Sequence, residues 1–183
     1  FDRLWQSPHV RFAGGVTVFD GNAPHAARII GSDRPSVSLE TLRHCFDAVE
    51  ASLDRMQLDT IDILYLHKED HETPLAETVR AMADLIGQGK ILHFGVSNYR
   101  AWRVAEICNL CDEMGIDRPV ASQPLYNALN RKAETEHLPA CGYYGLGVVH
   151  YSPLARGVLT GKYAPQDAPP PDTRAGRADK RMM

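Results

Sequence analysis

The sequence predicts an α/β fold built on a parallel sheet. Amphipathic helical stretches alternate with short apolar runs from residue 37 onward. The apolar runs begin near residues 61, 91, 119 and 146, and this repeat of about 30 residues is the length of one strand plus one helix. Each helix returns the chain to the same end of the sheet, so successive strands are expected to run parallel.

The composition is that of an ordinary globular domain. The 183 residues are 44% hydrophobic and 23% charged, which excludes collagen-like, coiled-coil and disordered chains. A net charge of −3 gives the chain no attraction to nucleic acid or to an anionic membrane face, and no apolar run is long enough to span a membrane. Four cysteines in a chain of this length make no disulfide framework, so we expect a single-domain cytoplasmic protein.

The first helix of the repeat is predicted after Ser38, where apolar residues recur at spacings of three and four. Residues 61–66 then form an apolar run typical of a buried strand. Thr73 and Pro74 open the next helix, and Gly89 is placed to end it. The apolar stripe of the first helix consists of Leu39, Leu42, Phe46, Val49, Leu53 and Met56.

The remaining elements alternate in the same way. In chain order they are a strand over 91–96, a helix that ends near Gly115, a strand over 120–123, a helix over 133–144 and a strand over 146–151. From Ala164 onward Pro, Asp, Arg and Gly dominate, which predicts a loop over 164–183.

Polar side chains stand where the predicted strands end. Because the carboxyl ends of parallel strands meet at one edge of the sheet, these side chains are expected to converge. A ring of hydroxyl, amide and imidazole groups suits a small molecule with many donors and acceptors better than a metal ion. The residues are His67, Ser97, Asn98, Gln123, Asn127, Tyr151 and Ser152.

Five ordered motifs over residues 38 to 175 resemble the aldo-keto reductase family. They are the run from Ile61 to His67, the pair Gly89-Lys90-Ile91 and Gly95-Val96-Ser97-Asn98, the run from Gln123 to Asn127, the run from Tyr151 to Gly157, and the run from Leu159 to Tyr163. The nearest likeness is to the branch that includes potassium-channel β subunits and bacterial aldo/keto reductases. The resemblance implies a (β/α)8 TIM-type barrel of which this chain shows about five units.

The resemblance also implies a chemistry, in which NADPH transfers a hydride to an aldehyde or ketone and an acid protonates the resulting oxygen. His67 would bind the carbonyl oxygen. Ser97, Asn98 and Gln123 would hold the nicotinamide carboxamide, and Tyr151 would stack on the nicotinamide ring. The pyrophosphate would run along Ser152, Leu154, Arg156, Gly157 and Lys162, and Arg174 would close over it.

The resemblance weakens before residue 37. The apolar run from Ala13 ends at Asp20, which by the family pattern would be catalytic, but the family's acidic tyrosine does not follow it. Asp20 and His67 are 47 residues apart. Two barrel units would need about 60 residues.

Two explanations stay open. The sequence is a discontinuous part of a longer chain, which its first residue, Phe1, supports, or the protein is a shortened family member that has lost its acid. We favour the first, because a barrel without interior strands would expose backbone edges.

Other interpretations stand beside the reductase. A nucleotide-binding regulatory or scaffolding subunit of the same fold would keep the cofactor and turn over little. A metal-dependent hydrolase would use His67 and His71, which lie close to two carboxylates, although this loop lacks the partner ligands that a closed metal site needs. Cys108 and Cys111 have a redox-like spacing but fall within a predicted helix. The carbonyl substrate cannot be identified from these residues, and a homo-oligomer stays open.

Overall fold

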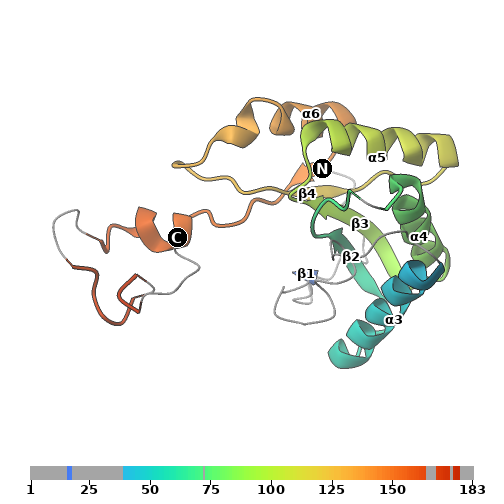
Figure 1. The fold of residues 1–183 in the computed structure, drawn as a ribbon, viewed down its shortest axis with the longest axis horizontal. Helices are drawn as coiled ribbons and strands as arrows, with labels where there is room; N and C mark the ends of the chain where they lie inside the picture. Colours follow the sequence, from blue (N-terminus) through green and yellow to red (C-terminus); the bar gives the residue numbers. More distant parts are fainter. Residues whose placement is uncertain (1–15, 18–38, 72, 164–167, 174, 178–183) are drawn as a thin grey trace, which may run out of the picture.

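The computed structural model describes residues 16–17, 39–71, 73–163, 168–173 and 175–177 (Figure 1). Its five strands form one parallel sheet in the order β1-β2-β3-β4-β5, which confirms the predicted parallel α/β fold for this part of the chain. The strands are β1 (Val16–Thr17), β2 (Ile61–Leu66), β3 (Ile91–Ser97), β4 (Ala121–Gln123) and β5 (Gly147–Val148). The helices are α3 (Leu39–Met56), α4 (Leu75–Gly87), α5 (Ala101–Met114) and α6 (His137–Tyr144), with the 3-10 turns η1 (Lys132–Glu134) and η2 (Ala155–Thr160).

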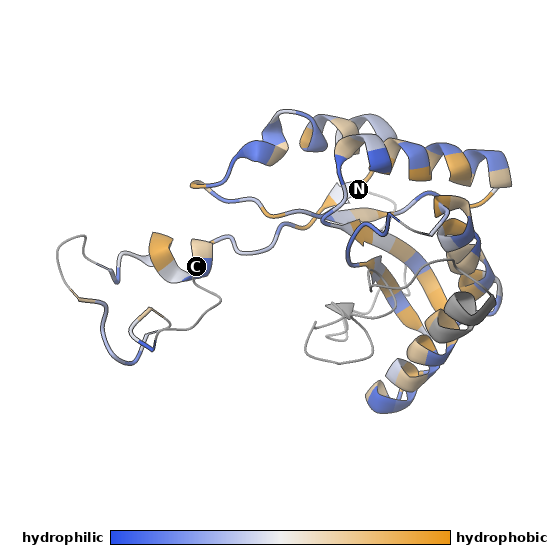
Figure 2. Cartoon of the chain, in the orientation of Figure 1, coloured by the Kyte–Doolittle hydropathy of each residue, from blue (hydrophilic) through white to orange (hydrophobic). Residues whose placement is uncertain are grey.

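The core lies between the sheet and the helices, which follow one another along one side of it (Figure 1). Successive side chains of a strand point to opposite faces, so Leu64, Phe94 and Val96 enter this core together. Figure 2 shows the hydrophobic residues gathered along β2 and β3. The helices contribute buried residues at helical spacing, among them Val79, Met82, Leu85, Val104 and Ile107.

The predicted glycine stops of two helices are confirmed. Gly115 follows α5 with φ +68°, and the next amide, that of Ile116, donates to the Cys111 carbonyl at 3.0 Å. Gly89 has φ +70° after α4, and Lys90 N–H donates to the Leu85 carbonyl at 3.0 Å. A residue without Cβ adopts this left-handed conformation at low cost, which lets the last carbonyls of each helix find partners.

Two predicted elements are shorter than expected. The helix predicted over 133–144 is divided into η1 and α6, with Glu136 outside helical geometry. A continuous helix would place the Pro139 ring against the carbonyl of residue 135, so the α-helix begins anew at His137. The strand predicted over 146–151 is confined to β5 and an isolated bridge between Leu125 and Tyr151, because three-residue β4 offers few partners.

The amino-terminal prediction is tested only at β1. The strand predicted before Asp20 is represented by β1, which pairs directly with β2 through Val16 opposite Ile63. Asp20 lies outside the described residues. Within the described part of 164–183, the chain forms turns and loop. Among the helices that the structure describes, none combines the length and the hydrophobicity that a membrane span requires.

Candidate functional site

The predicted polar residues are collected at the carboxyl edge of the sheet. His67 follows β2, Ser97 ends β3, Gln123 ends β4, and Tyr151 lies three residues beyond β5. The register places Val96 opposite Ser122 and Ser97 opposite Gln123, so the strand ends are level with one another. A parallel sheet brings these ends together because every strand runs in the same direction.

Asn98 is the centre of the cluster. Its Nδ2 donates to the main-chain carbonyl of His67 at 2.9 Å and to Ser97 Oγ at 3.1 Å. Its Oδ1 accepts the phenolic O–H of Tyr151 at 2.9 Å. Asn98 has φ +58°, a conformation that asparagine tolerates better than most residues. One exposed amide thus links the ends of β2 and β3 to the segment after β5.

Ser97 and Gln123 lie deeper. Ser97 is 3% exposed, and its hydroxyl donates to the main-chain carbonyl of Gln123 at 2.8 Å. The Ser97 hydroxyl therefore donates to β4 and accepts a hydrogen bond from Asn98 Nδ2, and its donated bond links β3 to β4. Gln123 is 9% exposed, and its side-chain amide makes no hydrogen bond with the residues that the structure describes.

A second side-chain amide, that of Asn127, holds the segment that contains Tyr151. Asn127 Nδ2 donates to the carbonyl of Ser152 at 3.0 Å, while its Oδ1 accepts the amides of Leu129 and Asn130 at 3.0 Å each. The main chain of Tyr151 donates to the Pro124 carbonyl at 3.0 Å. The sequence places Asn127 at a strand end without indicating its role, and only these contacts identify it as the residue that holds the segment after β5.

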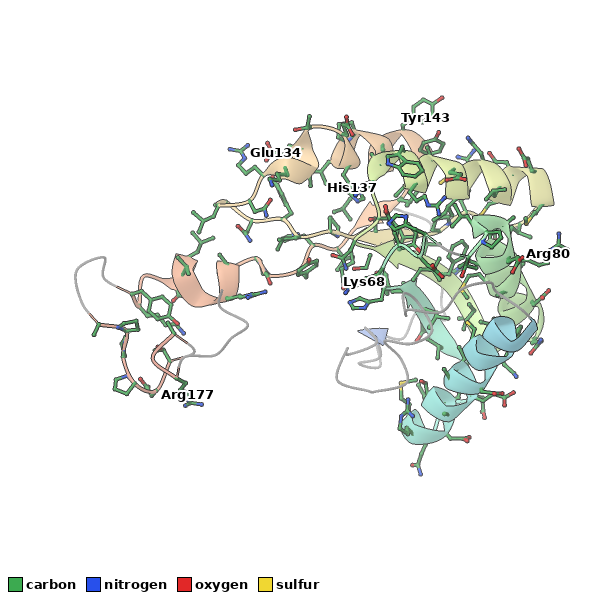
Figure 3. The ribbon with its side chains drawn as sticks, in the orientation of Figure 1. Lys68, Arg80, Glu134, His137, Tyr143 and Arg177 are labelled. Carbon is green, nitrogen blue, oxygen red and sulfur yellow. The ribbon has the colours of Figure 1, made fainter. Side chains whose placement is uncertain are left out.

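The His67 ring lies half-buried at the end of β2. Burial, and then the charge of the adjacent Lys68, lower its pKa, so the imidazole is neutral at physiological pH. Figure 3 labels Lys68 at this edge of the sheet. A neutral imidazole can donate a hydrogen bond to a carbonyl oxygen through one nitrogen and accept one through the other.

The remaining predicted residues are not brought to this cluster. Figure 1 shows η2 extending away from the sheet. Leu154 directly precedes this turn, Arg156 and Gly157 lie on it, and Lys162 follows it. There Lys162 Nζ stands 5.3 Å from the Tyr163 ring centroid. Asp20 and Arg174 lie outside the described residues.

The described part of the loop after β2 brings one histidine close to a carboxylate. His71 Nε2 stands 3.6 Å from Glu69 Oε2. In the described part of the chain no three His, Cys, Asp or Glu side chains are grouped so that they could hold a metal ion. Cys108 and Cys111 are buried free thiols within α5, and burial raises their pKa values to about 11 and about 12.

The comparison with protein-family models identifies a family. The model described as "Aldo/keto reductase family" matches residues 28–180, which is most of the chain and includes every residue of the strand-end cluster. The chain belongs to the aldo/keto reductase family.

Some similar proteins are named as reductases and others as potassium-channel subunits. The chain is 47% identical over 119 residues to "Aldo-keto reductase family 7 member A3" of Homo sapiens, covering 65% of this chain and 36% of that protein. It is equally identical over 119 residues to "Aflatoxin B1 aldehyde reductase member 2" of Mus musculus, covering 65% and 32%. It is 38% identical over 140 residues to "Probable voltage-gated potassium channel subunit beta" of Oryza sativa subsp. japonica, covering 76% and 43%. The chain therefore spans about a third to two fifths of the length of these relatives.

The nicotinamide cofactor typical of aldo/keto reductases fits one part of the cluster. The Gln123 amide has both a donor and an acceptor without partners among the described residues, which suits a carboxamide. The Tyr151 ring is held by its O–H on Asn98 and is partly open to solvent, which suits stacking. The cationic residues near η2 lie apart from these groups, so the phosphate end of the site is not assembled in the described residues.

Proposed function

We propose that the protein is an NADPH-dependent reductase of aldehydes or ketones. The observation that carries the proposal is the linked cluster of His67, Asn98 and Tyr151 at the carboxyl edge of a parallel sheet, in a chain that belongs to the aldo/keto reductase family. The name of the mouse relative, an aldehyde reductase, supports an aldehyde as substrate.

We further propose that the sheet is part of a closed (β/α)8 barrel. Strands that neighbour one another in strict chain order, with helices along one side, are the arrangement of a barrel wall. A doubly wound sheet would instead reverse its strand order at a switch point and carry helices on both faces. The ligand of such a barrel binds at the carboxyl ends of the strands, where the cluster lies.

The residues would divide the work between holding the cofactor and orienting the substrate. When bound, NADPH supplies the hydride. Gln123 would hold the carboxamide together with Asn98 Oδ1, which keeps one lone pair after accepting from Tyr151, and Tyr151 would set which ring face is offered. The neutral His67 imidazole would donate a hydrogen bond to the carbonyl oxygen and fix its direction. Ser97 would act through Gln123 and Asn98, since its hydroxyl is buried and already paired.

Cofactor titration tests the proposal. NADPH added to the chain should change nicotinamide fluorescence with a saturable curve, and NADH should bind more weakly, as the usual cofactor preference of the aldo/keto reductase family implies. Gln123→Ala should weaken NADPH binding, while Gln57→Ala, far from the strand ends, should leave it unchanged. Tighter binding of NADH would reject the NADP assignment, and no binding of either nucleotide would reject the proposed function.

A regulatory subunit is the second candidate. Two observations favour it: the similarity to potassium-channel β subunits, and the absence of any tyrosine before Tyr65 or lysine before Lys68. Without an acid near the carbonyl, hydride transfer would leave an alkoxide that nothing protonates. Saturable NADPH binding with no reduction of simple aldehydes would favour this function over the reductase.

A further inference from the structure

The segment between β2 and α4 is fastened to the beginning of α5. The carboxylate of Glu69 accepts the main-chain N–H of Arg100, the residue that precedes α5. The Glu69 side chain is only 8% exposed, so this is a carboxylate placed in the interior beside a helix amino terminus. A carboxylate at this position is stabilised by the free N–H groups and the dipole of the helix.

Arg103, one turn into α5, makes the second attachment. Its side chain is 12% exposed. One terminal nitrogen, Nη2, donates to the main-chain carbonyl of Asp70 at 3.2 Å, and the other, Nη1, donates to Glu106 Oε2 at 2.7 Å. The guanidinium carbon stands 5.3 Å from the centroid of the Trp102 ring. Arg103 Nε is buried and has no hydrogen-bond partner among the described residues. The protein therefore encloses this nitrogen although it is not paired.

Together with the Asn98 contact, these two attachments hold one short stretch of chain, residues 67 to 70. Asn98 Nδ2 holds the His67 carbonyl, and Glu69 and Arg103 hold the chain two and three residues later. The segment from His67 to Asp70 is thereby attached to Asn98, which follows β3, and to the first turn of α5. A planar guanidinium can serve two acceptors at once, which a lysine ammonium on a flexible stem does poorly.

We propose that Arg103 and Glu69 are positioning residues that hold the His67 imidazole at the strand-end cluster. The proposal rests on the proposed function for the role of His67 in orienting a carbonyl. The placement of the imidazole can be measured without substrate or cofactor.

The test follows the His67 ring by NMR in Arg103→Met, which keeps the aliphatic stem and removes the donors. The His67 signal is assigned by its loss in a His67→Gln variant. With the segment released, the ring should become more exposed, and its titration midpoint should rise toward the ordinary histidine value of about 6.5. Exchange of the Arg100 amide with solvent should also become at least about tenfold faster in Glu69→Ala, and Glu69→Gln, which keeps an acceptor oxygen, should restore part of the protection.

Arg118→Met is the matched control. Arg118 is also paired with a carboxylate of α5, through two hydrogen bonds of 2.8 and 2.6 Å to Asp112, but at the far end of the helix. This variant should leave the His67 titration and the Arg100 exchange as in the unmodified chain. If Arg103→Met does not fold, Arg103→Lys replaces it, since the ammonium cannot keep both contacts.

Two outcomes separate this proposal from the proposed function. An unchanged His67 titration in folded Arg103→Met or Arg103→Lys would overturn the positioning role, whatever NADPH does. A shifted titration in a chain that binds no NADPH would support the positioning role while rejecting the reductase. In a preparation that reduces an aldehyde, Arg103→Met should lower kcat about tenfold or more and change NADPH affinity less than about threefold.

Discussion

The Tyr151 hydroxyl donates to Asn98 Oδ1 at 2.9 Å, although the two residues are 53 positions apart in the chain. The contact joins the segment after β5 to the end of β3 across the intervening strand β4. It uses the one acceptor of an amide whose two donors are already engaged with His67 and Ser97. Loss of this hydrogen bond would therefore release the Tyr151 ring and leave Asn98 Oδ1 without its donor, while Asn98 stays held through Nδ2.

Tyr151→Phe should separate this hydrogen bond from the stacking surface of the ring. We expect a loss of about 0.5–1 kcal/mol in the free energy of unfolding, because the bond is exposed to solvent. NADPH affinity should fall several-fold, because the ring is no longer fixed. Urea denaturation and fluorescence titration measure the two effects. Tyr143→Phe, on the solvent side of α6, is the control (Figure 3). Unchanged NADPH affinity in Tyr151→Phe would contradict the role of the tether.

His67→Ala should affect turnover and spare the cofactor. A hydrogen bond from His67 that strengthens in the transition state would contribute about 100-fold or more to the rate. The nucleotide would be bound by residues other than His67. In a preparation that reduces a simple aldehyde, kcat should fall by that order with NADPH affinity nearly constant. Full activity in the variant, or loss of NADPH binding together with folding, would show that His67 is structural.

Gly95→Ala should destabilise the sheet. A Cβ on Gly95 would stand 2.7 Å from Tyr65 Cε1 and 2.8 Å from the Ala121 main-chain oxygen, and the second atom cannot move without disturbing β4. We expect a loss of about 1–3 kcal/mol or more in urea unfolding. Gly142→Ala is the matched control, since a Cβ there meets nothing within 4 Å. That change in α6 should instead stabilise by about 0.5–1 kcal/mol. Equal effects of the two substitutions would contradict the close approach of Tyr65.

Acidification should destabilise the fold partly through His137. Its Nε2 shares a hydrogen bond of 2.8 Å with Ser122 Oγ between α6 and β4, and burial lowers its pKa. The unfolded chain therefore binds a proton more readily than the folded chain. The stabilisation is complete above the ordinary pKa of about 6.5 and is lost as the pH falls below it.

Urea midpoints measured between about pH 7.5 and about pH 5 test this dependence. His137→Gln should reduce the loss of stability on acidification, and His150→Gln, at an exposed position, should not. Burial also lowers the pKa of His67, so some acid sensitivity should persist in His137→Gln. An unchanged pH profile in His137→Gln would show that His137 does not contribute.

Much of the fold could be predicted because its signals are local. The alternation of apolar runs and amphipathic stretches marked β2, β3, α3 and α5 closely, and Gly89 and Gly115 end their helices for a backbone reason visible in the residue type alone. The division of the helix over 133–144 was missed even though its cause, Pro139, is also local. β5 was predicted too long because a strand extends only as far as its neighbour offers partners.

The parallel α/β class, the order of elements and the family follow from residue types at regular spacings along the chain, so they can be read from the sequence. The pairing of the strand-end groups becomes visible only in the folded chain. The fold engages both N–H donors of Asn98 and one lone pair of its oxygen, and it leaves the Gln123 amide without a described partner. It also places Glu69 and Arg103 against the segment after His67. It also directs η2, the turn on which Arg156 lies, away from the sheet. The physical reason is that a hydrogen bond depends on distance and direction in space, and residues 30 to 50 positions apart acquire these only when the sheet brings their strands together.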